Sequence, residues 1–62
     1  METQALLRYG QRMRLLRQRA GLSLREAASR AKIDKNTLMK LERGDAVRAT
    51  VRKKICKAYG VM

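Results

Sequence analysis

Histidine, proline, phenylalanine and tryptophan are all absent from this 62-residue chain. Without Phe or Trp, aliphatic side chains must fill the core, and a chain of this length forms one domain at most. The lack of His and the presence of only five acidic residues leave almost nothing for general acid–base, nucleophilic or metal chemistry. We therefore expect no enzyme, no cofactor, no metal site and no small-molecule substrate.

Cysteine and long apolar runs are also scarce. The single cysteine, Cys56, excludes an internal disulfide framework and a cysteine-based zinc site, and we interpret it as a packing residue. No apolar run approaches the roughly 20 residues that a membrane span requires. With no signal-peptide pattern at the N-terminus, a reducing cytoplasm is the expected location.

Positive charge is what the chain has in excess. Sixteen Lys and Arg residues oppose five acids, so the net charge is +11. Such an excess favours a polyanionic partner, either nucleic acid or an anionic membrane surface.

Glycines divide the chain into short amphipathic segments with helical periodicity. The first helix is expected to end at Arg19 or Ala20, with Gly21 stopping it. Residues 1–7 could extend this helix or form a separate arm. Its expected buried stripe, at spacings of three and four, is Leu6, Tyr9, Met13, Leu16 and Ala20.

Two shorter helices are expected next, each with a recognisable N-cap. Ser23 and Glu26 form a capping-box pattern, and Asp34 precedes a third helix over 35–43 that Gly44 terminates. The inward residues of these helices are Leu24, Ala27, Ala28, Ala31, Leu38 and Leu41. A fourth helix is expected over roughly 50–59, with Val51, Ile55, Ala58 and Tyr59 inward.

The segment from Leu24 to Gly44 meets the physical requirements of a helix-turn-helix. A small residue, Ala28, lies where the two helices cross, and Ile33 provides an apolar plug for the turn. The turn also needs a left-handed backbone at a position that is usually Gly. Lys32 occupies it here, at a cost on the order of 1 kcal/mol.

Three stretches of this chain, GQRMRLLRQRAGLSLREAA, IDKNTLMKLERG and KICKAYGV, resemble the Xre-type helix-turn-helix family of bacteria and phages, which includes Cro and the phage repressors. The resemblance covers most of the chain from Gly10. It implies a single all-α, lambda-repressor-like domain over 1–62, a compact bundle of four or five short helices. The family usually continues into a fifth helix, so this chain is expected to be a minimal member or an excised DNA-binding domain.

The resemblance also implies a binding site on the third helix. Base edges would be met by Lys35, Asn36, Met39 and Lys40. Lys can donate to guanine, Asn can bridge the adenine edge, and Met can touch a thymine methyl. Contacts to the phosphate backbone are expected from Thr37, Arg43, Arg25 and Lys32. Many members carry Gln at the position of Leu24, where it touches the DNA backbone, so that contact is not expected here.

One structural pair follows from the same resemblance. Family members often pair an Arg late in the first helix with the Glu of LERG, which here gives Arg17 and Glu42. The implied function is sequence-specific binding of double-stranded DNA by a transcriptional regulator. It would act as a homodimer in the cytoplasm of a bacterium, at the nucleoid, or be phage-encoded.

Two alternatives stay open at this stage. The same fold could serve as a protein-interaction module, such as an antitoxin or phage regulator, for which Leu7 and the off-stripe Leu15 are the hints. The charge also suits a cationic amphipathic segment on an anionic membrane. The caps, the glycine stops and the alanine crossing point favour a compact fold over that second alternative.

Overall fold

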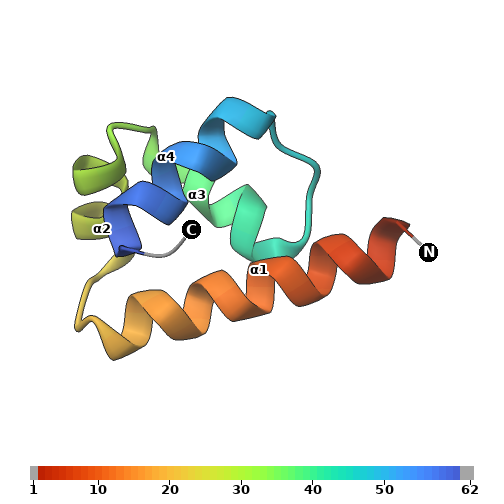
Figure 1. Ribbon diagram of the computed structural model, residues 1–62, viewed down its shortest axis with the longest axis horizontal. Helices are drawn as coiled ribbons and strands as arrows, with labels where there is room; N and C mark the ends of the chain where they lie inside the picture. Colours follow the sequence, from red (N-terminus) through yellow and green to blue (C-terminus); the bar gives the residue numbers. More distant parts are fainter. Residues whose placement is uncertain (1, 61–62) are drawn as a thin grey trace.

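The computed structural model describes residues 2–60, and over that range the chain forms four α-helices and no strand. The helices are α1 (Glu2–Arg19), α2 (Leu24–Ala31), α3 (Lys35–Arg43) and α4 (Ala49–Tyr59). Figure 1 shows the long α1 running along one side of the molecule, with the three shorter helices gathered on the other. The predicted all-α bundle is confirmed with four helices; no fifth helix occurs within residues 2–60.

The first helix is longer than its buried stripe requires. It begins at Glu2, so residues 2–7 extend it and do not form a separate arm; Met1 lies outside the described residues. The helix ends at Arg19, where the Leu22 amide bonds the Arg17 carbonyl at 3.1 Å and Gly21 adopts φ +73°. Ala20 therefore lies beyond the helix and is exposed, so its predicted place on the buried stripe was wrong.

Gly10 is the residue that lets α1 approach α3 closely. It is buried in the middle of α1, and a Cβ atom there would lie 2.4 Å from the Leu41 carbonyl oxygen and 2.8 Å from that of Glu42. Only a residue without a side chain fits between the two backbones. Glycine destabilises the interior of a helix, but at this position the close packing of α1 against α3 requires it.

The caps predicted for α2 and α3 are confirmed. Ser23 Oγ accepts from the Glu26 amide at 3.1 Å, and Glu26 Oε1 accepts from the Ser23 amide at 2.9 Å, which completes the capping box. Asp34 Oδ2 accepts from the Asn36 amide at 3.0 Å at the start of α3. These bonds satisfy backbone donors that a helix start would otherwise leave unpaired.

The turn between α2 and α3 depends on Lys32. This residue has φ 58° and ψ 45°, and it is the one non-glycine residue with positive φ in the described part of the chain. The Lys32 amide bonds the Ser29 carbonyl at 3.1 Å, and the Ile33 amide bonds the Ala28 carbonyl at 3.0 Å. The predicted left-handed position is confirmed.

The core lies between the four helices, and α3 and α4 supply its most deeply buried side chains. Leu38 and Leu41 of α3 and Ile55 of α4 are fully buried, and each contributes roughly 1.5–3 kcal/mol through burial. α3 packs against α1 and α2, and α2 packs against α4. The remaining buried hydrophobic residues are Met13, Leu22, Ala27, Ala28 and Ala31. The alanines of α2 let the neighbouring helices come close, as their small size predicts.

Candidate nucleic-acid interface

The buried residues of α3 determine which of its side chains face outward. Leu38 and Leu41 are 0% and 1% exposed, so the rotation of the helix about its axis is set by the core. The opposite face carries the four residues expected to meet base edges. At about 100° per residue they span roughly 140° of the circumference, and all four are exposed: Lys35, Asn36, Met39 and Lys40. The structure therefore brings these four side chains together on one accessible surface.

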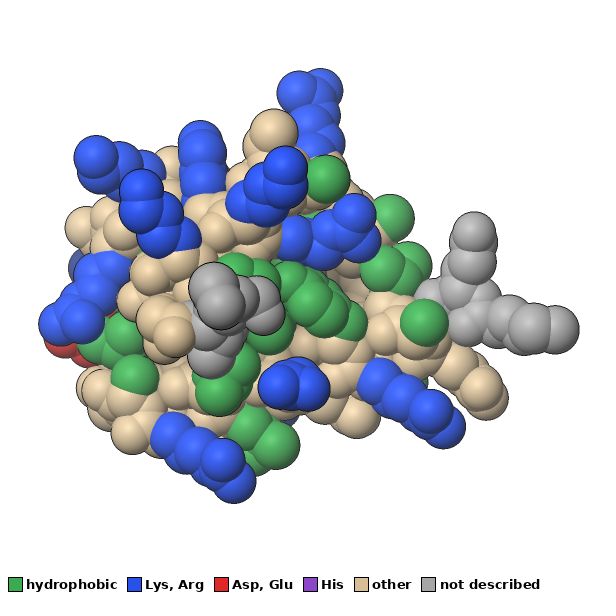
Figure 2. Space-filling view, viewed as in Figure 1, with side chains coloured by type: hydrophobic (Ala, Val, Ile, Leu, Met, Phe, Trp, Pro, Cys, Tyr) green, Lys and Arg blue, Asp and Glu red, His purple; other side chains and the backbone are tan. Residues whose placement is uncertain are grey.

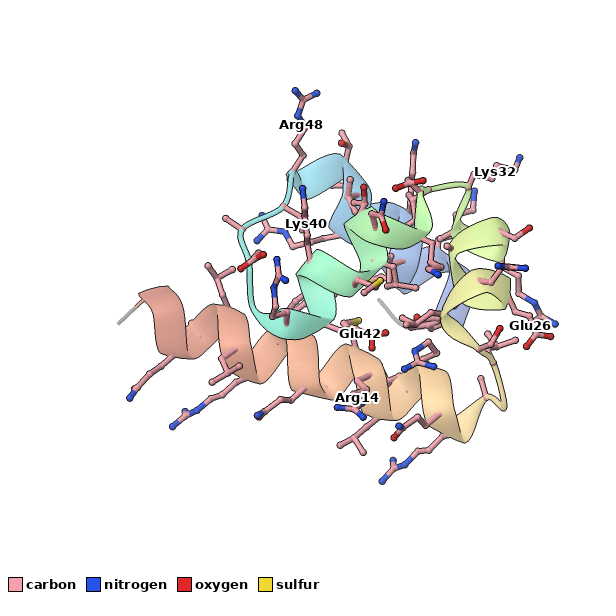
Figure 3. The ribbon with its side chains drawn as sticks, turned by 180° about the vertical axis from the view of Figure 1, so that it is seen from behind. Arg14, Glu26, Lys32, Lys40, Glu42 and Arg48 are labelled. Atoms are coloured by element: carbon pink, nitrogen blue, oxygen red, sulfur yellow. The ribbon has the colours of Figure 1, made fainter. Side chains whose placement is uncertain are left out.

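The four residues expected to contact the phosphate backbone differ in how exposed they are. Lys32 is exposed in the turn and projects on the same side of the molecule as Lys40 (Figure 3). Arg25 is exposed on α2, whereas Thr37 is only half-exposed. Arg43 is exposed at the end of α3 but is engaged within the chain.

That engagement is an ion pair between Arg43 and Asp45. Asp45 Oδ2 accepts from Nη2 at 2.5 Å and from Nε at 3.2 Å. Both side chains are largely exposed, at 69% and 45%. A pair this exposed contributes about 0–1 kcal/mol, so exchanging the carboxylate for a phosphate would cost little.

Arg17 and Glu42 join α1 to α3 beneath the interface. Glu42 accepts twice from the Arg17 guanidinium, from Nε at 2.7 Å and from Nη2 at 3.1 Å, and both side chains are nearly buried. The third nitrogen, Nη1, donates to the Leu22 carbonyl at 2.9 Å. Hydrogen bonding to Glu42, and to a lesser extent the negative charge of its carboxylate, raises the pKa of Arg17 above its ordinary value, and burial opposes the shift. The arrangement ties α3 to α1 at a fixed angle.

Two tyrosines lie behind this pair, on the side of α4. Burial raises the pKa of Tyr59 to about 12; the negative charge of Glu42 adds to the effect, and the positive charge of Arg17 opposes it. Burial also raises the pKa of Tyr9 to about 12, assisted by Cys56, whose Sγ lies 3.6 Å from the Tyr9 hydroxyl. Both phenols stay neutral at physiological pH, so the back of the interface carries no added negative charge.

A shallow groove opens where α1, α2 and α3 meet. It has a volume of about 380 Å³, and its lining is Arg14, Arg17, Leu24, Met39, Glu42 and Arg43. Leu24 and Met39 are the apolar members. Leu24 thus supplies an apolar wall beside α3, where the sequence analysis expected no contact with the DNA backbone.

Arg14 is a residue of this surface that the sequence analysis missed. It is exposed on α1 and lines the groove together with Met39 and Arg43 of α3. The signal was present in the sequence. Arg14 precedes Arg17 by three residues, so the two lie on neighbouring positions of the same helix surface.

Arg48 is a second missed residue. It is the N-cap of α4 but makes no capping hydrogen bond through its side chain, and it is exposed. In Figure 3 it projects from the same side as Lys40 and Lys32. A cation at a helix N-terminus opposes the helix dipole, so Arg48 is poorly placed to stabilise α4. Its position suits an external anion instead, and the loop sequence before α4 gave no sign of this.

The acidic residues do not interrupt the cationic surface. Four have described side chains, and each is engaged: Glu26 and Asp34 cap helices, and Glu42 and Asp45 pair with arginines. Figure 2 shows Lys and Arg around most of the rim of the opposite face, with acidic atoms visible only at its edge. Residues 2–60 contain no cluster of His, Cys, Asp and Glu that could hold a metal ion. No helix among them is long and apolar enough to span a membrane.

Two short helices joined by a tight turn, with the second presenting an exposed polar face, define this molecule as a helix-turn-helix domain. The chain belongs to the helix-turn-helix domain family, whose model matches residues 8–62. Comparison with curated proteins and with solved structures gave no match. Membership of this family indicates a DNA-binding domain.

Proposed function

We propose that this protein binds double-stranded DNA in a sequence-specific manner and regulates transcription, with α3 in the major groove. The observation that carries the proposal is the exposed face of α3, which offers Lys35, Asn36, Met39 and Lys40 as one continuous surface. These side chains can address guanine, adenine and thymine edges by different chemistry. Donors of one kind would bind phosphate alone, whereas this mixture suits the discrimination of bases.

Backbone contacts flank the helix in the proposed complex. Lys32 and Arg48 lie on the same side as Lys40 (Figure 3), and Arg14 lines the same groove as Met39. These cations would set the register of the protein on the duplex without reading sequence. Arg43 would join them after leaving Asp45.

The homodimer belongs to the same proposal. Two copies would place two α3 helices in major grooves about one helical turn apart, on half-sites related by two-fold symmetry. Gel filtration with and without a duplex measures the assembly. A complex of one copy on a selected site that contains only one half-site would contradict the dimer while leaving DNA binding intact.

Selection from a pool of random duplexes, followed by salt titration, tests the central proposal. We expect a defined sequence to be enriched and its affinity to fall steeply with salt as counterions are displaced. Equal affinity for selected and random duplexes would refute specific recognition. Affinity that does not depend on salt would refute the phosphate contacts.

Two variants separate base reading from backbone contact. Lys40→Ala should weaken binding to the selected site by about 1–3 kcal/mol of binding free energy. It should also relax the base preference at one position of that site. Arg48→Ala should weaken binding to all duplexes alike. It should also lower the slope of the logarithm of affinity against the logarithm of salt concentration by about one. Lys57→Ala, which removes an exposed cation from α4, is the matched control and should change neither.

A protein-interaction role on the same fold is the competing proposal. Leu7 and Leu15 favour it, because they are 43% and 53% exposed without a polar function of their own. Substitution of both by Gln changes no residue of α3, and circular dichroism checks that the contact of Leu7 with Gly44, the C-cap of α3, does not disturb the fold. Loss of self-association with unchanged DNA affinity would assign these residues to a protein contact.

A further inference from the structure

The outward face of α1 carries a row of cations that the proposed function does not use. Arg8, Arg12 and Arg19 share this face with Leu15, at spacings of four, three and four residues, and all four are exposed. At about 100° per residue the row falls within roughly 60° of the helix circumference. We call these four residues the α1 stripe.

The α1 stripe points away from the recognition helix. Gly10 meets the backbone of α3 and Arg17 binds Glu42, so the opposite side of α1 faces solvent. Figure 3 shows nitrogen-tipped side chains along the edge of α1 that faces away from α3, while Lys32, Lys40 and Arg48 project from the other edge of the molecule. The molecule measures 30 × 21 × 20 Å, so the two cationic surfaces are separated by no more than the width of this small domain.

Nothing described on the molecule neutralises the α1 stripe. No described side chain of α1 is acidic, and the four described carboxylates elsewhere are engaged in caps or ion pairs. Arg8 and Arg12 repel each other at a spacing of four residues, which disfavours the helix. The arrangement therefore opposes the stability of α1 and calls for an external anion.

We propose that the α1 stripe binds the phosphate backbone of a second DNA duplex, so that one molecule bridges two segments of DNA. The proposal rests on the proposed binding of the first duplex through α3. Arg8 and Arg19 are 11 residues apart, about 16 Å along the helix axis, which spans several phosphates of one strand. Guanidinium groups suit this partner, because they can donate two parallel hydrogen bonds to a phosphate.

An anionic membrane fits the α1 stripe less well. A helix that lies in a membrane interface buries a broad apolar face among the lipids. The apolar face of α1 is instead used inside the protein, where Met13 is buried and Tyr9 and Leu16 pack against the core. Leu15 alone interrupts the exposed arginines, which is too little apolar surface for insertion.

A bridging assay tests the proposal with the whole chain. Two selected duplexes, one with a donor and one with an acceptor fluorophore, are mixed in excess over protein, and energy transfer between them is measured. The variant R8Q/R12Q/R19Q should lose most of the transfer while keeping its affinity for a single duplex. The salt slope of bridging should fall by about three, one for each phosphate contact removed. The control K53Q/K54Q/K57Q removes the same charge from exposed positions on α4 and should bridge like the parent.

The possible outcomes are distinct. Equal loss of bridging in both triple variants would assign bridging to net charge and overturn the role of the α1 stripe. Single-duplex binding by the parent without energy transfer would overturn the proposal and leave the proposed function standing, whereas no binding of any duplex would remove both. Cosedimentation with vesicles of phosphatidylserine that needs the three arginines, without bridging, would assign the surface to membranes. Circular dichroism checks that all variants keep their helices.

Discussion

The α2–α3 unit and α1 are held in place by different kinds of interaction. Each helix of the α2–α3 unit begins with a side-chain cap and ends in a left-handed residue, and all of these bonds join residues close in sequence. The position of α1 depends on Gly10 and Arg17, which meet α3 residues 25 or more positions away. Interactions between residues close in sequence thus form the α2–α3 unit, and long-range contacts with α1 fix its orientation.

This difference predicts two kinds of damage. Loss of a cap should lower stability while leaving the folded geometry unchanged, because the core still fixes the rotation of α3. Loss of an α1–α3 contact should lower stability further and also change the orientation of the α3 face that we propose reads bases.

Arg17→Met should produce the largest loss. Removing the guanidinium leaves the Glu42 carboxylate nearly buried and unpaired, which costs about 3 kcal/mol of unfolding free energy. A domain of this size has roughly 3–9 kcal/mol in total, so the variant should be close to unfolding at 37 °C. Urea titration followed by circular dichroism gives the value.

The double variant R17M/E42L is the matched control. It removes the unpaired charge as well, so it should recover a large part of the lost stability. We also expect it to bind the selected duplex with less base preference, because α3 is no longer tied to α1 by the ion pair. A single variant that loses less than about 1 kcal/mol would show that α1 is held by other contacts.

Gly10→Ala should come next. The added Cβ would overlap the carbonyls of Leu41 and Glu42, and the two helices must separate to admit it. We expect a net loss of about 2 kcal/mol, even though Ala is favoured over Gly inside a helix by about 1 kcal/mol. Thermal unfolding of the two proteins measures the difference.

Gly21→Ala is the control that distinguishes steric overlap of an added Cβ, expected at Gly10, from strain of the backbone alone. Gly21 also resists substitution, because its φ is +73°, but a Cβ there meets open space. Its expected cost is about 1 kcal/mol, with no effect on base preference. If Gly10→Ala stabilised the protein, the close approach of α1 to α3 would be refuted.

Ser23→Ala should have a smaller effect, confined to stability. The capping box of α2 disappears, at a cost of about 1 kcal/mol. The cap also has a pH dependence. Its hydrogen bonds with Ser23 hold the pKa of Glu26 below the ordinary value of 4.5, so this contribution is present above that pH and is lost as the pH falls through the lower, folded value.

The measurement is the difference in melting temperature between the parent and Ser23→Ala at two pH values. The difference should be full at pH 7 and should shrink in acid, whereas Ser29→Ala, on the exposed side of α2, should show none at either pH. A changed base preference in Ser23→Ala would contradict the idea that local caps affect only stability, while the α1–α3 contacts orient α3.

The same division explains how much the sequence could predict. The caps at Ser23 and Asp34 and the left-handed Lys32 were predictable, because each depends on a few neighbouring residues whose chemistry is specific. Gly10 was not recognised as a contact residue, because its reason is a carbonyl on α3 that only the folded chain brings near. Arg48 was missed for the same reason. It projects from the same side of the molecule as Lys40, which belongs to another helix, and the loop sequence carries no signal of this common side.

Lys32→Gly should have the smallest effect on stability, and one of opposite sign. Glycine removes the strain of φ 58°, worth about 1 kcal/mol, but adds freedom to the unfolded chain, so a net gain of about 0.5 kcal/mol is expected. The lost charge should weaken binding to every duplex alike and lower the salt slope by about one. Lys32→Asn tolerates the left-handed backbone and also lacks the charge, so it should match the glycine variant in DNA affinity. If both variants bind as tightly as the parent, Lys32 serves the turn alone, and the cationic surface beside α3 begins beyond it.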